Sequence, residues 1–537
     1  MTSSARPHPI LGSLFPSAPS AALDTDDASI DAIVGLWLAE AAELPAHPAA
    51  AAFDPRPYPE WTAKPGQWLA APLADSGPRA FAVGLGAPPD PAAWGSPESA
   101  TAEAIHAVRK AAATTAQQLH ATDARRIGFQ LDPRLGDLAD ADALQAALVD
   151  GLALGAFRFD ALRGSSQADS PAKPDRPAGP WVVAADRAAD LAASTAAVAR
   201  GVQTARTLAA LPPNLLNPAT LAGLCQRIAD DAGLTCTVHD ADALADMGCG
   251  GILAVGRAGS APPCLIQLEW NPPDAPADAP PALVVGKAVT FDSGGYNLKP
   301  TGGKGMKYDK CGGMAAIGIA EAVARAAHTQ RVVALIPAAE NLVAHSAYRP
   351  DDILTMHNGV TVEITNTDAE GRLILADALS YGTQTFQPRC VFDLATLTGG
   401  AVVALGDDTI AAFCNDPTLE AALAHASALT GERLWRLPLW PSHRAMLEST
   451  HADIVNSGER KASAIQGAAF LSHFVGNDAP KQLPTVPWVH LDIAPTATSS
   501  NAAPPFGKGP TGSGVRLVSR TLLDGGEPAA ASTDMGS

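Results

Sequence analysis

Six short apolar runs in the second half of the chain constrain its fold most strongly. They are rich in aliphatic side chains and each carries a single charged residue, a composition typical of strands buried on both faces of a sheet, above all in parallel sheets. The runs are CLIQLEW (264–270), ALVVGK (282–287), RVVALIP (331–337), VTVEIT (360–365), CVFDLAT (390–396) and WVHLDIA (488–494). Helix-like stretches at 312–327 and 373–382 separate several of them. This half is therefore predicted to form a mixed, mainly parallel central sheet flanked by helices.

The first half of the chain predicts a smaller α/β domain. Strand-like runs at 79–86, 126–131 and 181–185 alternate with helix-like runs at 98–121 and 143–159. A polar, proline-rich segment at 164–180 is predicted to be a surface loop.

A chain of 537 residues is too long for one ordinary core, so two domains are expected. A long helical run ends at the prolines of Pro212–Asn214, which marks the predicted boundary. We predict an N-terminal α/β domain over 1–185, a linker helix over 186–213, a larger C-terminal domain over 214–525 and a disordered tail over 526–537.

Composition and charge argue against several classes of protein. The net charge of -18 and the lack of a Lys/Arg cluster make nucleic acid an unexpected partner. We found no apolar stretch of the roughly 18 residues that a membrane span needs. The N-terminal residues show no basic leader followed by an apolar segment, which favours a cytoplasmic location. The seven cysteines form no C-x-x-C pair, so reduced thiols are expected and a thiolate zinc site is not.

The segment NTDAEGR (366–372) follows one of the apolar runs and carries two acids and an arginine at alternate positions. In an extended segment, Asp368, Glu370 and Arg372 would point to the same side. Two carboxylates so close repel each other, and a metal ion between them would relieve that repulsion. Taken alone, the same pattern is more often a helix N-terminal cap.

Two further segments place charged residues where apolar runs end. VVGKAVTFDSGGYNLKP carries Lys287, Asp292 and Lys299, and GMKYDKCGG places Asp309 just before a helix. Taken singly, these lysines are usually solvated and such Gly-Gly segments are usually only turns. Pooled with Asp368 and Glu370, the four carboxylates suit a pair of divalent ions about 3.5 to 4 Å apart. The ligand types alone do not choose among zinc, manganese, cobalt and magnesium.

These segments resemble the leucyl aminopeptidase family of dinuclear metallopeptidases. NTDAEGR is the complete family signature, and VGKAVTFDSGGYNLKP (285–300) with MKYDKCGG (306–313) closely follows the family's other site segment. The resemblance covers most of residues 205–520, with further matches at LPPNLLNP (211–218), DLATLTG (393–399), HLDIAPTA (490–497) and GPTGSGVRL (509–517).

The resemblance implies a role for each matching residue. The metal ligands would be Lys287, Asp292, Asp309, Asp368 and Glu370, holding two divalent ions per subunit, manganese or zinc. Asp292 and Glu370 would bridge the ions, and a hydroxide shared by the ions would attack the first peptide carbonyl. Lys299 would polarise that carbonyl, and Arg372 would hold a bicarbonate ion that acts as general base.

The resemblance also implies a substrate and an assembly. The enzyme would release N-terminal amino acids from peptide substrates, with leucine-like residues preferred, and would form a cytoplasmic homohexamer. The implied substrate pocket consists of Met306, Asn366, Ala369, Leu397, Thr398, Gly399 and Ala494. The chain departs from the family pattern at Pro495, at Ala497 and between Glu459 and Ser463, so the side-chain preference stays open.

The sequence allows two alternative functions. One is a DNA-binding or regulatory protein, which the acidic charge opposes and a gel shift would test. The other is an inactive scaffold that has kept its ligands, which hydrolysis of leucine p-nitroanilide with added manganese or zinc would distinguish from an enzyme.

Overall fold

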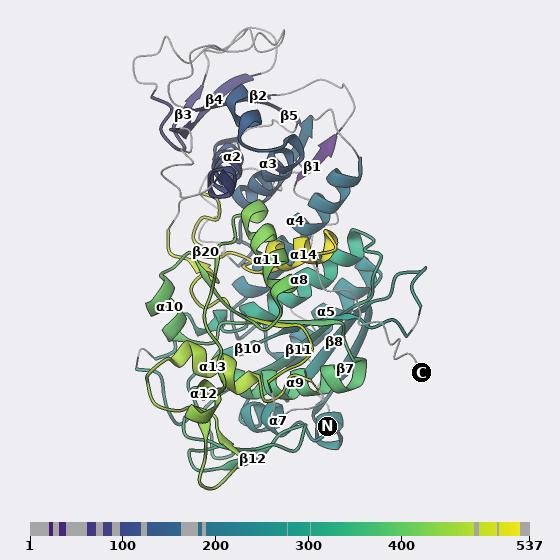
Figure 1. Cartoon of the computed structure of the whole chain (residues 1–537), viewed down its shortest axis with the longest axis vertical. Coiled ribbons are helices and arrows are strands. Elements are labelled where there is room, and N and C mark those ends of the chain that lie inside the picture. The colour runs from purple at the N-terminus through teal and green to yellow at the C-terminus, as the bar shows by residue number, and fades with distance from the viewer. Residues whose placement is uncertain are drawn as a thin grey trace.

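Two sheets, one from each half of the chain, organise the fold (Figure 1). A six-stranded sheet is formed before residue 185, and a nine-stranded sheet is formed after residue 234. The predicted two-domain α/β class is thereby confirmed. The computed structural model describes residues 21–24, 32–38, 62–70, 79–87, 97–119, 126–162, 181–184, 189–276, 278–300, 302–476, 483–501 and 504–526.

The six-stranded sheet is parallel except at one edge, where β3 runs antiparallel to β4. Its spatial order is β1 (Ala21–Asp24), β6 (Trp181–Ala184), β5 (Arg126–Leu131), β2 (Ala32–Leu38), β4 (Arg79–Gly86) and β3 (Trp68–Ala70). The crossover segments between its parallel strands include α2 (Pro97–Leu119), η2 (Pro133–Asp137) and α3 (Ala141–Ala156). The strands and helices predicted for this half are confirmed to within a few residues. The loop predicted at 164–180 lies outside the described residues.

The nine-stranded sheet is mixed and mainly parallel, as predicted. The neighbours β18, β14, β9 and β11 run parallel, while β15 is antiparallel to β18 and β8 is antiparallel to β11 and β7. The spatial order is β16 (Leu434–Arg436), β15 (Ile410–Cys414), β18 (Trp488–Asp492), β14 (Cys390–Ala395), β9 (Ala282–Gly286), β11 (Val332–Asn341), β8 (Cys264–Trp270) and β7 (Thr235–His239), and β10 (Ala288–Asp292) pairs with β11.

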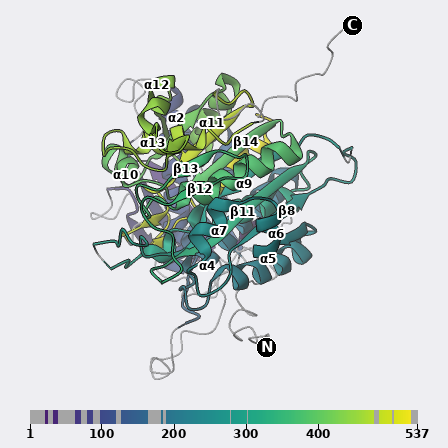
Figure 2. The same cartoon turned by 90° about the horizontal axis from the view of Figure 1, so that it is seen from below.

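Helices cover both faces of this sheet, and Figure 2 views the molecule from the side of α7 and α9. One face carries α5 (Pro218–Ala232), α8 (Cys311–Arg325) and α14 (Val515–Leu523), with α4 (Ala189–Ala210) packed on α8. The other face carries α7 (Gly250–Gly256), α9 (Gly371–Phe386) and α13 (Ser463–Leu471). The remaining elements are α6 (Ala241–Asp246), η4 (Met306–Tyr308), α10 (Gly399–Leu405), α11 (Pro417–Thr430), α12 (Pro441–Arg444), η5 (Ala445–Leu447), β19 (Thr498–Ser499) and β20 (Gly509–Pro510).

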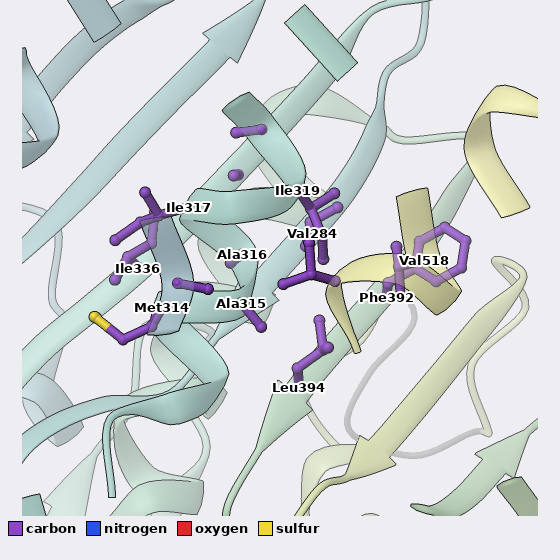
Figure 3. Close-up of a cluster of buried hydrophobic side chains, with 14 of the residues drawn as sticks. Val284, Met314, Ala315, Ala316, Ile317, Ile319, Ile336, Phe392, Leu394 and Val518 are labelled. Carbon is purple, nitrogen blue, oxygen red and sulfur yellow. The ribbon is translucent and has the colours of Figure 1, made fainter. Parts of the chain in front are cut away.

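Alternate side chains of the central strands fill two separate cores. Val284 and Ile336 pack with α8 on one face (Figure 3), while Leu283, Val285 and Leu335 pack with α9 on the other. Each fully buried aliphatic side chain contributes about 1.5 to 3 kcal/mol, so both faces hold the sheet in register. None of the helices in the described part of the chain has the length and apolar character of a membrane span.

The apolar run at 360–365 is not a strand of the central sheet, which corrects the sequence-based prediction. Its residues form β13 (Thr361–Glu363), which lies between β12 (Ile353–Thr355) and β17 (Ile454–Val455) in a separate small sheet. Only Val362 of β13 is fully buried, whereas Thr361 and Glu363 are half-buried. This alternation of apolar and polar residues suits a strand with one exposed face.

Helix α4, predicted as a linker, packs closely against the second half of the chain. Gly201 of α4 and Gly318 of α8 lie at the crossing of the two helices. A Cβ atom added to Gly201 would lie 2.2 Å from the carbonyl oxygen of Gly318. Two glycines are therefore required for the helices to approach this closely.

We expect Gly201→Ala to destabilise the protein by about 1 to 3 kcal/mol, because the added methyl group forces the backbones apart. Gly223→Ala is the matched control, since Gly223 is an exposed helical glycine with open space around its Cβ position. This control should be neutral or stabilising by about 0.5 to 1 kcal/mol. Urea unfolding of both variants checks the prediction, and equal midpoints would contradict it.

Candidate metal centre

The parallel strands bring the predicted ligands to one edge of the sheet. Lys287 follows β9, Asp292 ends β10, and Asp309 lies two residues before α8. Asp368 and Glu370 come directly before α9. Carboxyl ends of parallel strands and the loops after them form the usual site of an open α/β sheet.

Lys287 joins two of the predicted ligands. Its ammonium lies 2.7 Å from Asp309 Oδ1 and 2.9 Å from Glu370 Oε1, and it donates to the carbonyl oxygen of Thr396 at 2.9 Å. Thr396 Oγ1 also donates to Asp309 Oδ1 at 2.9 Å. The side chain of Lys287 is 3 % exposed, so its charge depends on these acids rather than on solvent.

Lys299 joins the other two acids. Its Nζ lies 2.6 Å from Asp292 Oδ2 and 2.5 Å from Asp368 Oδ1. The five predicted ligands and Lys299 thus form one continuous group of charged side chains. The sequence-based requirement that they share one site is met, although their roles are not tested by their positions alone.

The acids have the geometry and free oxygens that a divalent cation needs. Asp292, Asp368 and Glu370 each offer a carboxylate oxygen, and these three oxygens lie within 4.8 Å of one another. Asp309 Oδ2 and Glu370 Oε2 are buried and accept no hydrogen bond from the described residues. Buried carboxylate oxygens without a donor are costly, and hard divalent ions are natural partners for them. The residues present therefore fit divalent metal ions.

The electrostatics of the group point in the same direction. Burial, reinforced by the charge of Glu370, raises the pKa of Asp292 to about 6. Burial also raises the pKa of Asp309 well above its usual range, although Lys287 opposes that rise. For Glu370, burial is outweighed by Lys287 and Lys299, which lower its pKa to about 2. Two ammoniums thus leave two of the acids incompletely neutralised, and a further positive charge would be favoured here.

Arg372 lies in the first turn of α9, close to the metal-binding group. It is 6 % exposed, and its Nη1 donates to the carbonyl oxygen of Asn456 at 2.7 Å. Burial lowers its pKa to about 10, so the guanidinium stays charged at neutral pH. A charged guanidinium near a helix N-terminus is a favourable place for an anion.

Asp492 brings together two parts of the predicted substrate pocket. It accepts hydrogen bonds from Leu397 N at 3.1 Å, from Thr398 Oγ1 at 2.7 Å and from Ala494 N at 3.1 Å. Thr398 is also the N-cap of α10, directly before Gly399. Asp492 was missed by sequence reasoning, although a charged residue at the end of the apolar run 488–494 is a usable signal.

The other predicted pocket residues lie in the chain segments that also carry the predicted ligands. Asn366 and Ala369 belong to the NTDAEGR segment, and Asn366 Oδ1 accepts a hydrogen bond from Asp368 N at 2.9 Å. Met306 begins η4, and its carbonyl oxygen accepts from Asp309 N at 3.2 Å. Contact of these residues with the substrate is a prediction.

The departures from the family pattern fall at two places near the pocket. Pro495 and Ala494 line a cavity of about 620 Å³ that also includes residues of α2. The side chains of Glu459 and Lys461 are strongly exposed, and Lys461 Nζ lies 3.4 Å from Glu459 Oε2. The backbone carbonyl oxygens of Glu459 and Lys461 each accept a hydrogen bond from Gln466 Nε2 at 2.6 Å. The segment 459–461 is therefore held in place through its backbone.

Gly371 is needed beside Lys287. A Cβ atom at Gly371 would lie 2.4 Å from Lys287 Cε and 2.5 Å from Nζ. Because a lysine tip can move while the fold persists, we expect Gly371→Ala to displace the amine and lower activity by roughly 100-fold, with reduced metal content. Gly136→Ala, where a Cβ meets nothing within 4 Å, is the control. Unchanged activity and metal content in the Gly371 variant would contradict this prediction.

The fold and the site together define a class of protein. A two-domain α/β chain with carboxylates and lysines gathered at parallel strand ends is the architecture of a hydrolase that uses divalent metal ions. The chain matches the cytosol aminopeptidase family, with the catalytic domain at residues 203–519 and the N-terminal domain at residues 60–166. The chain belongs to the cytosol aminopeptidase family, a family of metal-dependent aminopeptidases, and the resemblance inferred from NTDAEGR is confirmed.

Relatives support this assignment over most of the chain. A probable cytosol aminopeptidase of Syntrophotalea carbinolica is 42% identical over 420 residues, which is 77% of this chain and 81% of the relative. A probable cytosol aminopeptidase of Roseiflexus castenholzii is 42% identical over 421 residues, covering 78% and 83% of the two chains.

Solved structures are similar as well. The bottromycin maturation enzyme BotP in complex with Mn has a TM-score of 0.78 and 34% identity, and the match covers 93% of this chain and 100% of that one. A mutant of tomato leucine aminopeptidase has a TM-score of 0.77 and 26% identity over 97% of this chain and 98% of that one. The predicted enzyme class, an aminopeptidase-type hydrolase, is confirmed.

Proposed function

We propose that this chain releases N-terminal amino acids, leucine-like residues preferred, from peptides with the help of two divalent ions, manganese or zinc. The observation that carries this proposal is the convergence of Lys287, Asp292, Asp309, Asp368 and Glu370, with Lys299 beside them. The manganese in the similar BotP structure supports the choice of metal.

Each predicted ligand has a distinct place in this proposal. Glu370 pairs with Lys287 and Asp292 pairs with Lys299, and these two acids would be shared by both ions, whereas Asp309 and Lys287 would complete one ion's site and Asp368 the other's. Lys287 must give up its proton to act as a ligand, so metal binding there would release a proton. When bound, such a pair of ions polarises a carbonyl group and lowers the pKa of a water molecule that supplies the attacking hydroxide.

Lys299 would act on the substrate carbonyl. Burial opposes its charge, but Asp292 and Glu370 outweigh burial and raise its pKa, so the side chain is an ammonium at neutral pH. An ammonium fixed at the edge of the acids can stabilise the negative charge that develops on the carbonyl oxygen. Only 17 % of its side chain is exposed, so this charge acts in a partly desolvated place.

Arg372 would supply the site of the general base. Its charge and the N-terminus of α9 would hold a small anion such as bicarbonate, a group that could supply the general base for the attacking water. Removal of bicarbonate from the buffer should then slow turnover. Arg372→Ala should lose that bicarbonate dependence.

The remaining features of the proposal follow from the family. We propose a cytoplasmic homohexamer, with domains at 1–185 and 214–525, a linker over 186–213 and a tail over 526–537. The N-terminal family model matches residues 60–166, inside the first range, and the catalytic family model matches residues 203–519, which begins within the proposed linker. A pocket of Met306, Asn366, Ala369, Leu397, Thr398, Gly399 and Ala494 would hold the substrate's side chain.

Metal analysis combined with an aminopeptidase panel tests the proposal. The purified protein should hydrolyse leucine p-nitroanilide with manganese or zinc, lose activity with a chelator and recover it on readdition of metal. An N-acetylated substrate is the control and should not be cleaved. A metal-loaded protein that cleaves none of the panel would favour the inactive scaffold instead.

A further inference from the structure

The loop that carries Lys299 is held to the loop that carries Asp368, and the contact lies away from the ligands themselves. The Lys299 loop begins at Asp292 and contains two glycines with positive φ, Gly294 at 89° and Gly295 at 63°. Its apolar side chains cannot fix it, because Tyr296 is 49 % exposed and Leu298 is 62 % exposed. The loop is therefore held by hydrogen bonds, together with the ion pairs of Lys299 with Asp292 and Asp368.

Asn297 and Thr367 make these bonds reciprocally. Asn297 N donates to Thr367 Oγ1 at 2.8 Å, and Thr367 N donates to Asn297 Oδ1 at 2.8 Å. Thr367 Oγ1 in turn donates to the carbonyl oxygen of Gly294 at 2.7 Å. The single hydroxyl of Thr367 thus contacts the Lys299 loop at both Gly294 and Asn297.

The backbone of Thr367 extends the connection to a third segment. Its carbonyl oxygen accepts from Asn341 Nδ2 at 3.0 Å and from the Tyr348 hydroxyl at 2.7 Å. Asn341 Nδ2 also donates to Asp292 Oδ1 at 2.8 Å. Thr367 is 0 % exposed, so these bonds form in a dry environment where each is strengthened.

There is no space in this contact for rearrangement. A Cβ atom at Gly295 would lie 2.9 Å from Thr367 Oγ1, and one at Gly294 would lie 2.8 Å from Asp368 Oδ1. The Lys299 loop therefore lies directly against the segment that supplies Asp368. A shift of the loop would change the distance from Lys299 Nζ to Asp368 Oδ1, which is 2.5 Å.

We propose that Thr367, with Asn297 as its partner, is a positioning residue that fixes the ammonium of Lys299 relative to the metal-binding acids. Thr367 supplies no oxygen to the acid group and acts through Lys299. Its effect on turnover rests on the proposed function, whereas its effect on the loop does not.

Thr367→Val tests the proposal, because valine keeps the shape of threonine and removes the hydroxyl. The variant should retain the metal content of the wild type, lower kcat at least 10-fold and change KM by less than about threefold. Thr367→Ser, which restores the hydroxyl, should recover kcat to within about threefold of the wild type. Thr361→Val is the matched control, since Thr361 donates its hydroxyl to Asp453 in the small sheet and should leave kcat unchanged.

A double-variant cycle identifies the residue through which Thr367 acts. In a Lys299→Met background, Thr367→Val should lower kcat by less than about twofold, because the positioned group is already absent. The proposal would be overturned if Thr367→Val lowered kcat as strongly in the Lys299→Met background as in the wild type. Loss of metal from the Thr367→Val single variant would also overturn it.

Hydrogen exchange measures the loop independently of activity. Thr367→Val should speed the exchange of a peptide covering residues 293–299, where Asn297 N loses its acceptor, and leave the exchange of α8 unchanged. Unaltered exchange of residues 293–299 would overturn the proposal even if the enzyme were active. Altered exchange without aminopeptidase activity in the wild type would instead refute the proposed function and leave the positioning intact.

Discussion

Glu370→Gln and Asp368→Asn should each remove bound metal and aminopeptidase activity together. Each change keeps the size of the side chain but removes one negative charge from a group in which three carboxylate oxygens lie within 4.8 Å of one another. Glu370 is 2 % exposed and forms an ion pair with Lys287. A neutral amide at position 370 removes that ion pair and leaves Lys287 paired with Asp309. We expect activity to fall by at least 1,000-fold at limiting metal.

Metal content and thermal stability check this prediction separately from activity. The wild type should melt at a higher temperature when manganese or zinc is added, because a ligand that binds only the folded state stabilises it. The two variants should show little of this shift. Asp408→Asn is the control, since Asp408 is an exposed acid paired with Arg433 and should behave as the wild type. Retention of two metals per subunit in Glu370→Gln or Asp368→Asn would show that the ligands have been assigned wrongly.

Lys299→Met should keep the metals and lose turnover. The ammonium lies 2.6 Å from Asp292 and 2.5 Å from Asp368, so its removal leaves these carboxylates more negative and should not weaken the binding of cations. The variant would no longer stabilise the oxyanion that develops on the carbonyl oxygen. Removal of one such donor typically lowers kcat by about 100- to 1,000-fold. Steady-state kinetics with a measurement of bound metal on the same sample checks both expectations.

A second lysine of the same loop region serves as the control. Lys304 is exposed, so Lys304→Met should leave kcat unchanged. If Lys299→Met instead loses its metals, Lys299 is a ligand and the roles of Lys299 and Lys287 have been exchanged.

The central sheet could be predicted from sequence because its strands are buried on both faces. The run 282–286 is apolar throughout and the run 390–395 carries Asp393 as its single charged residue, and each became a strand of the nine-stranded sheet. The run 360–365 did not, because its apolar positions alternate with Thr361 and Glu363, a pattern that suits a strand with one exposed face. An apolar run does not indicate the direction of its strand relative to its neighbours. The residues 264–270 therefore did not predict that β8 is antiparallel to β11.

The candidate ligands could be picked out from the sequence because they fall in motifs, but the residues that hydrogen-bond to them or to the predicted pocket could not. Lys287, Asp292, Asp368 and Glu370 lie at the ends of apolar runs, where a charged residue is conspicuous. Asn341, Thr396 and Asp492 act through hydrogen bonds to residues 49, 87 and 95 positions away. Such pairings depend on which strands become neighbours, and the order of the sheet is known only from the structure.

A crystal of the protein grown with manganese would test the central claim most directly, through anomalous difference density at the metal's absorption edge. We predict two peaks about 3.5 to 4 Å apart, enclosed by Lys287, Asp292, Asp309, Asp368 and Glu370. Density elsewhere in the molecule with none among these five side chains would contradict the account.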